Sequence, residues 1–183
     1  MSQTFLKNLN LLKQSGTFST LTGIQRGIEK EGLRTTPAGE LSQSAHPAAL
    51  GSALAHPSIT TDFSEALLEF VTPVMPTPEA AVNFLEDLHR FAYEILEEEI
   101  IWSSSMPCFL GGESSIPIAQ YGKSNIGTMK HIYRVGLEHR YGKTMQTIAG
   151  IHYNFSLPDD FWTAFRSVVA STESDRDFRD KQY

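Results

Sequence analysis

Two glutamates in the stretch GIQRGIEKEGLR are spaced as neighbours on one face of a β-strand. Side chains at positions i and i+2 of a strand point the same way and lie about 6 to 7 Å apart. Glu29 and Glu31 would therefore repel one another unless a cation balances their charge. Carboxylate oxygens are the ligands that Mg²⁺ prefers, and phosphoryl chemistry often uses paired cations. The spacing fits a metal site; for this motif alone, a solvated strand face is the alternative.

Further acidic groups and one imidazole occur in segments that also have the pattern of strands. The stretch TTDFSEALLEF contains Asp62 and Glu69, and Glu69 lies between two apolar residues, where an unpaired charge would be costly. In GIHYNFSLP, His152 and Asn154 share the polar face of an alternating pattern. Such a histidine is often an ordinary sheet residue. Three strands that each carry acid or imidazole groups on one face nevertheless favour a single sheet lining a metal-binding cleft.

Hydrophobic periodicity predicts the elements that must carry these groups. The best-supported helix follows Thr77, a favourable N-cap, with Pro78 at the first helical position. The charged stretch TESDRDFRDKQY is expected to add no core element. We expect strands over residues 23–33, 66–73 and 150–158, and helices over residues 4–13, 77–96, 128–140 and 159–169, with a short helix within residues 46–57.

The segment between residues 103 and 127 is rich in Ser, Gly and Pro and is expected to be a long loop. Loops of that size in compact domains usually carry function or disorder. The GKSN tetrapeptide in it lacks the full spacing of a phosphate-binding loop and is interpreted as a polar turn. Cys108 has no paired-histidine signal and is interpreted as structural or neutral. The helix that follows is expected to bury Met129, Ile132, Val135 and Leu137.

Composition limits the classes of protein that the chain can belong to. Its 183 residues, 40% of them hydrophobic, suffice for a real core. The net charge of -6 has no basic tract, which argues against a nucleic-acid partner. A single cysteine forms no intrachain disulfide, the amino terminus lacks the pattern of a signal peptide, and no run approaches the roughly 20 apolar residues of a membrane span. We therefore expect no membrane partner and a cytoplasmic location.

Taken together, these residues closely resemble the amino-terminal part of the proteobacterial glutamate-cysteine ligase family. The resemblance rests on blocks in the family's order: GIQRGIEKEGLR, HPAALGSALAHPSITTDFSEALLEFVTP, MPCFL, AQYGKSNIG, YRVGLEHRYG and MQTIAGIHYNFSLP. It implies an α+β fold similar to glutamine synthetase, with an antiparallel sheet curved into a funnel and helices outside. Family chains continue for several hundred residues. The resemblance therefore implies that residues 1–183 are the amino-terminal part of one catalytic domain, with the funnel and the catalytic machinery incomplete.

The resemblance also implies a reaction and its residues. ATP would phosphorylate the γ-carboxylate of glutamate, and the amine of cysteine would attack the acyl phosphate, giving γ-glutamylcysteine in the first step of glutathione synthesis. Mg²⁺, with Mn²⁺ as an alternative, would hold the phosphates. The residues carried over as metal ligands are Glu29, Glu31, Asp62, Glu69 and His152. Those carried over as the cysteine pocket are Phe63, Tyr133 and Leu137, and those placed near the glutamate moiety are Asn154 and Gln146.

Two other functions remain open from the residues themselves. A related carboxylate-amine ligase would keep the fold and join glutamate to another amine, so that Phe63 and Tyr133 would need a different assignment. A non-catalytic domain that binds a metal or a small molecule would keep the acidic face without the reaction.

Overall fold

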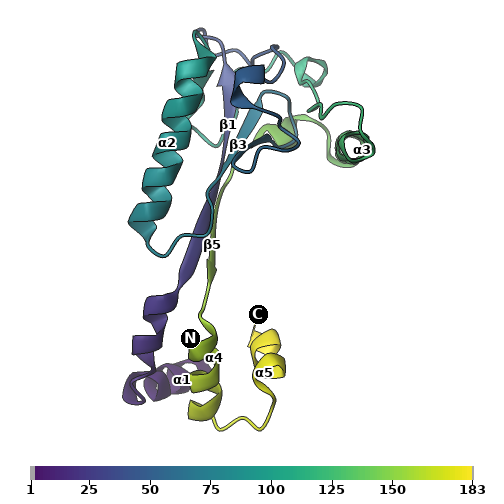
Figure 1. Cartoon of the computed structure of the whole chain (residues 1–183). Helices are drawn as coiled ribbons and strands as arrows, with labels where there is room; N and C mark the ends of the chain where they lie inside the picture. The colour runs from purple at the N-terminus through teal and green to yellow at the C-terminus, as the bar shows by residue number, and fades with distance from the viewer. Residues whose placement is uncertain (1–2, 183) are drawn as a thin grey trace.

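The computed structural model describes residues 3–182, in which one long strand organises a five-stranded antiparallel sheet (Figure 1). Strand β1 (Gln25–Thr35) pairs with β3 (Leu67–Val71) along one edge and with β5 (Ile151–Ser156) along the other. Strand β2 (Ile59–Thr61) lies outside β3, and β4 (Ile100–Ile101) pairs with the end of β1. The expected α+β class with an antiparallel sheet is confirmed, and the strands predicted around residues 23–33, 66–73 and 150–158 are all present.

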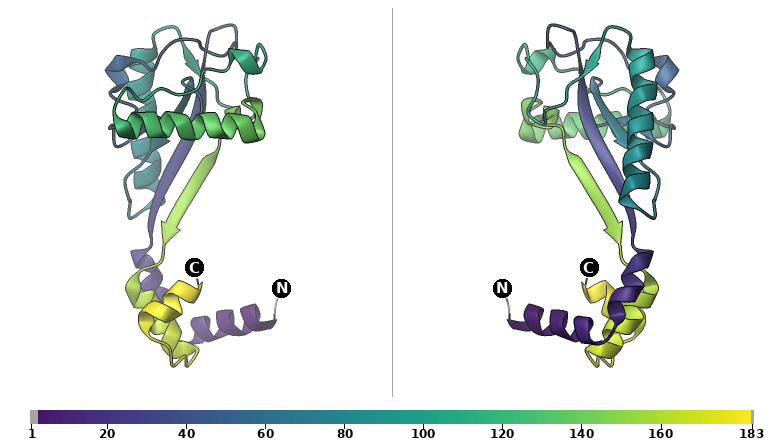
Figure 2. Two further views of the ribbon diagram at one scale, coloured as in Figure 1. Left: turned by 90° about the vertical axis from the view of Figure 1, so that its right-hand side faces the viewer. Right: turned by 90° about the vertical axis from the view of Figure 1, so that its left-hand side faces the viewer.

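Helix α2 (Pro78–Leu96) covers one face of this sheet, as the right-hand view of Figure 2 shows. Its start agrees with the sequence prediction, because the Thr77 hydroxyl accepts a hydrogen bond of 3.1 Å from the Ala80 amide. The apolar stripe of α2 then packs on alternate residues of the strands. The core between them consists of Leu50, Ile59, Leu68, Phe70, Ala92, Leu96 and Ile101.

The opposite face is covered only toward one end, by the long loop and by helix α3 (Asn125–Tyr141). The buried cluster there consists of Leu33, Leu41, Phe63, Ala66, Leu67, Cys108, Ile116 and Ala149. Burial raises the pKa of the Cys108 thiol, which agrees with a structural role for this residue. The rest of this face, along β1 and β5, stays open.

A second group of helices lies at the far end of the ribbon that β1 and β5 form (Figure 1). It comprises α1 (Gln3–Gln14), a 3₁₀ helix (Thr17–Gly23), α4 (Asp159–Val168) and α5 (Asp175–Gln182). The expectation that the charged stretch adds no core element is wrong. Phe178 of α5 is buried against Phe165, with ring centroids 5.5 Å apart, because this aromatic side chain faces inward while the charged residues around it face outward.

Two further helix predictions need correction. The segment 46–57 forms only a 3₁₀ turn (Ala48–Leu50), because Gly51 adopts a φ of 86° that ends it. Helix α3 begins at Asn125, three residues earlier than expected, because the Ser124 hydroxyl of the GKSN motif caps it by accepting from the Gly127 amide.

The buried face predicted for α3 is also largely wrong. Met129 and Ile132 are 64% and 61% exposed, and only Leu137 packs against the core. The reason is that polar contacts of His131 and Arg134 hold α3 to the backbone carbonyls of Ala119 and Asp62, which lie outside the strands. Strand β5 alternates as predicted, yet all six of its residues are exposed. Within residues 3–182, no helix is long and apolar enough to cross a bilayer.

We predict that Thr77→Ala lowers the free energy of unfolding by about 1 kcal/mol, because the Ala80 amide loses its cap. Urea unfolding followed by circular dichroism measures the change. Thr77→Ser, which keeps the hydroxyl, is the matched control and should stay close to the unsubstituted chain. Equal losses in both variants would contradict the capping role.

Candidate functional site

The register of the sheet brings the predicted polar residues onto one face. Residues directly opposite one another in an antiparallel pair project to the same side. Glu31 lies opposite Glu69, and Glu29 lies opposite His152. Asn154, opposite Gly27, continues the same row. Three strands therefore supply one acidic face, as the sequence predicts, and α2 covers the other side.

Asp62 joins this face from the turn between β2 and β3. Its amide donates a 3.0 Å hydrogen bond to the Leu67 carbonyl, which closes the turn next to the strand that carries Glu69. The charge of Asp62 acts on both Glu31 and Glu69. A residue outside the strands thus adds a fourth carboxylate to the site.

Burial and mutual repulsion perturb two of these carboxyl groups. Burial raises the pKa of Glu69 to about 6, and the charges of Asp62, Glu31 and Glu29 add to that effect while His152 opposes it. Burial also raises the pKa of Glu31, and the charges of Asp62 and Glu29 add smaller contributions. Two groups lower this pKa: the Gly150 amide, which donates to the carboxylate at 2.6 Å, and His152. The face therefore carries negative charge that its own surroundings do not neutralise.

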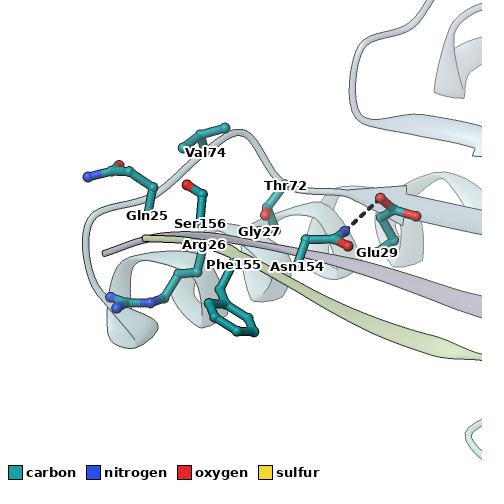
Figure 3. A pocket seen from close by; sticks show the side chains of 9 residues that line it. All are labelled: Gln25, Arg26, Gly27, Glu29, Thr72, Val74, Asn154, Phe155 and Ser156. Atoms are coloured by element: carbon teal, nitrogen blue, oxygen red, sulfur yellow. Dashed lines mark hydrogen bonds between the residues drawn. The ribbon is translucent and has the colours of Figure 1, made fainter. Parts of the chain in front are cut away.

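The residues fit a divalent cation in chemistry and charge, although the side chains do not converge on one point. In the part of the chain that the structure describes, no three His, Cys, Asp or Glu side chains are grouped closely enough to hold a metal ion. Local donors engage the carboxylates instead, with Asn154 Nδ2 2.8 Å from Glu29 Oε1 (Figure 3). Four carboxylates are nonetheless donors typical of hard cations, whereas the imidazole is a more typical ligand of transition metals. Holding an ion here would require these side chains to rotate toward one another.

A shallow pocket of ≈ 280 Å³ continues from the acidic face past Glu29 (Figure 3). Asn154 lies at its junction with the acidic face, hydrogen-bonded to Glu29. The Thr72 hydroxyl in the same pocket accepts a hydrogen bond of 2.9 Å from the Ile28 amide, so it is already engaged. The remaining lining comes from Gln25, Arg26, Gly27, Val74, Phe155 and Ser156. A small polar molecule would meet amide groups here, directly beside the carboxylates.

The residues expected to bind the two amino-acid substrates differ in how deeply they are buried. Phe63 is only 1% exposed and belongs to the core against which Leu137 packs. Tyr133 is 59% exposed on α3, and Gln146 is half-buried in a 3₁₀ turn (Thr144–Thr147). The structure brings Phe63 and Leu137 together, and Asn154 beside Glu29. The substrate roles of all five residues stay predictions.

Three residues that support the site were not assigned a role from the sequence. The buried Glu65 carboxylate accepts hydrogen bonds from the amides of His46 at 2.9 Å and Gln120 at 2.7 Å. Tyr121 and Arg134 bind the backbone of Asp62 from positions 59 and 72 residues further along the chain. Hydrogen bonds between residues so far apart in the chain leave no local sequence pattern. Only Glu65 could have been noticed, because it is an acid within a largely apolar run.

An open sheet face of carboxylates beside a small polar pocket suits enzymes that handle phosphate groups through divalent cations. Comparison with known proteins gives the family. A family model described as glutamate-cysteine ligase matches residues 9–183. The chain belongs to the glutamate-cysteine ligase family.

Individual relatives agree with this assignment. The chain is 56% identical over 172 residues, 94% of its length, to a glutamate–cysteine ligase of Saccharophagus degradans, covering 32% of that protein. It is 52% identical over 183 residues, its whole length, to that of Pseudomonas putida strain KT2440, covering 34% of that protein. The chain thus spans about a third of the length of the curated relatives it matches.

Two solved structures share the fold. A glutamate–cysteine ligase from Francisella tularensis, in complex with AMP, superposes with a TM-score of 0.78 at 43% sequence identity, over 81% of this chain and 30% of that one. A bifunctional glutathione synthetase from Pasteurella multocida superposes with a TM-score of 0.82 at 32% identity, over 93% of this chain and 22% of that one.

We predict that Glu69→Gln stabilises the chain at pH 8 in EDTA. Because its pKa is raised from 4.5 to about 6, the folded state holds the Glu69 proton more tightly than the unfolded state. The carboxyl group therefore favours folding fully below pH 4.5, and this contribution is lost as the pH rises through about 6. A neutral amide does not ionise and so avoids this loss of stability. Solvent screening of the half-buried group limits the gain in the free energy of unfolding at pH 8 to about 1 kcal/mol.

Urea unfolding at pH 8 and at pH 4 measures this difference, which should appear only at the higher pH. Glu94→Gln, an exposed position on α2, is the control and should change little at either pH. A gain of the same size at pH 4 would mean that packing, and not charge, causes it.

Proposed function

We propose that this chain supplies part of the active site of a ligase that joins cysteine to the γ-carboxylate of glutamate at the expense of ATP, through a γ-glutamyl phosphate. The observation that carries the proposal is the shared sheet face of Glu29, Glu31, Glu69 and His152, in a chain of the glutamate-cysteine ligase family. The AMP complex of the Francisella tularensis relative supports the use of a nucleotide. Residues 1–183 would form the amino-terminal part of one catalytic domain.

The acidic face would hold Mg²⁺, or Mn²⁺, through Glu29, Glu31, Asp62, Glu69 and His152. When bound, such a cation neutralises phosphate charge and places the transferring phosphoryl group in line with its acceptor. The chain's own contribution is positional. The strands fix the backbone of four of the five residues, while Gly150 and Asn154 orient the Glu31 and Glu29 carboxylates through hydrogen bonds of 2.6 and 2.8 Å.

The pocket beside Glu29 would take the glutamate substrate. Asn154 and Gln25 offer amide donors and acceptors for an amino acid. A glutamate bound there would direct its side chain along the row of carboxylates. Phe63 and Leu137, at the covered end of the same face, would limit the space left for the acceptor cysteine.

Cellular context follows from the substrates and is part of the proposal. ATP, glutamate and cysteine are small soluble metabolites, so we expect a cytoplasmic enzyme without a nucleic-acid or membrane partner.

A chimera tests the proposed function directly. Residues 1–183 of this chain replace the aligned segment of the Pseudomonas putida ligase, to which they are 52% identical. A coupled assay for ADP should then show release that requires glutamate, cysteine and Mg²⁺ together. ADP release from the folded chimera without any requirement for cysteine would refute the proposal, and faster release with 2-aminobutyrate than with cysteine would point to another acceptor amine.

Within that chimera, Glu31→Gln should lower kcat/KM at limiting Mg²⁺ by about 100-fold, because it removes a charge that places the cation. Glu94→Gln, which removes the same charge from the outer surface of α2, should leave kcat/KM unchanged. Circular dichroism and gel filtration establish that both variants are folded. Similar activity in the two variants would mean that Glu31 is an ordinary solvated residue of the strand face and does not place the cation.

A further inference from the structure

The turn that carries Asp62 is tied down by a distant segment of the chain. Residues 117–121, in the long loop before α3, cross this turn and bind it through backbone groups. The Ala119 amide donates to the Phe63 carbonyl at 2.9 Å, and the Glu65 amide donates to the Pro117 carbonyl at 2.9 Å. The Glu65 carboxylate closes the contact by accepting from the Gln120 amide. We call residues 117–121 the strap.

Tyr121 ends the strap and reaches the backbone of Asp62 directly. Its hydroxyl donates toward the carbonyls of Thr61 at 2.7 Å and Asp62 at 3.0 Å, and the Thr61 hydroxyl lies 3.2 Å away. The side chain is 5% exposed, so these bonds are shielded from water. Cationic groups of α3 lie over the ring, with Lys130 Nζ 4.9 Å and the Arg134 guanidinium carbon 4.7 Å from its centroid.

Arg134 holds the same carbonyl from α3. Its Nε donates to the Asp62 carbonyl, while its other end donates to Lys130 O at 3.0 Å, which keeps the side chain along the helix. The close approach of α3 requires Gly127, since any side chain there would collide with the Tyr121 carbonyl. Two separate elements therefore converge on the backbone of one acidic residue.

We propose that Tyr121 and Arg134 are positioning residues that fix the backbone of Asp62 and so aim its carboxylate at a cation shared with Glu31 and Glu69. This rests on the proposed function. The strand ladders already fix Glu29, Glu31, Glu69 and His152, but Asp62 follows the end of β2. Its carboxylate is repelled by its neighbours on the acidic face, so a free turn would let it swing away.

Mn²⁺ binding to the 183-residue chain, measured by electron paramagnetic resonance and calorimetry, tests this role. Tyr121→Phe removes only the hydroxyl and should weaken Mn²⁺ binding about fivefold, the equivalent of one hydrogen bond. Asp62→Asn should weaken it further. In the double variant the two effects should not add, because Tyr121 acts through Asp62. Tyr141→Phe, an exposed tyrosine at the end of α3, is the matched control and should bind Mn²⁺ as the unsubstituted chain does.

The outcomes separate positioning from general stability. Thermal unfolding in EDTA should show that Tyr121→Phe is folded, with a loss of stability no larger than that expected for removing one buried hydroxyl. If Tyr121→Phe does not fold, Arg134→Gln is put through the same cycle with Asp62→Asn. Unchanged Mn²⁺ binding, or losses that add fully to that of Asp62→Asn, would overturn the positioning role alone. Failure of the unsubstituted chain to bind Mn²⁺ would overturn the proposed metal site and this role with it.

Discussion

The register of β1 between β3 and β5 is the constraint on which the site depends. Because side chains alternate along a strand, a slip of one residue would turn Glu29 and Glu31 toward α2 and bring Lys30 to the open face. The register is fixed on both sides at once. Lys30 and Gly32 lie opposite the core residues Phe70 and Leu68 beneath α2, while Glu31 lies opposite Glu69 on the open side. The hydrophobic core therefore decides where the carboxylates go.

A buried ion pair anchors the other end of the same strand. Arg34 is fully buried, and its guanidinium donates to Glu99 at 2.6 Å and to the carbonyls of Ser44 and Glu65. Its own amide donates to the Ala66 carbonyl at 2.7 Å. Removing one partner from such a network leaves a buried charge uncompensated, so the contact resists change. It ties β1 to the turn that carries Asp62 through the carbonyls of Glu65 and Ala66.

Sequence patterns predicted the parts of this architecture that depend on local periodicity. The alternation of GIHYNFSLP identified β5, the cap at Thr77 identified α2, and the two-residue spacing placed Glu29 and Glu31 on one face; the register confirms that His152 and Glu69 join them. Patterns failed where distant contacts decide. Met129 and Ile132 look like a buried face, yet polar bonds from Arg134 and His131 hold α3 instead. Phe178 alone could not reveal that α5 packs on α4, and Tyr121 gives no local sign of its bond to Asp62.

Rigid strands also decide how the repulsion on the acidic face is relieved. Side chains on a flexible loop would move apart, but the ladder holds the backbones of Glu31 and Glu69 opposite one another. The repulsion between these carboxylates can then be relieved by binding a proton or by binding a cation. The pKa of about 6 at Glu69 means that the proton is held more tightly than on an exposed glutamate but is mostly released at neutral pH. Above that pH a divalent cation would compete with few protons, and its charge would offset the repulsion among Glu69, Asp62, Glu31 and Glu29 that adds to the effect of burial. The same repulsion that makes the acidic face unfavourable by itself would therefore favour the binding of a doubly charged cation.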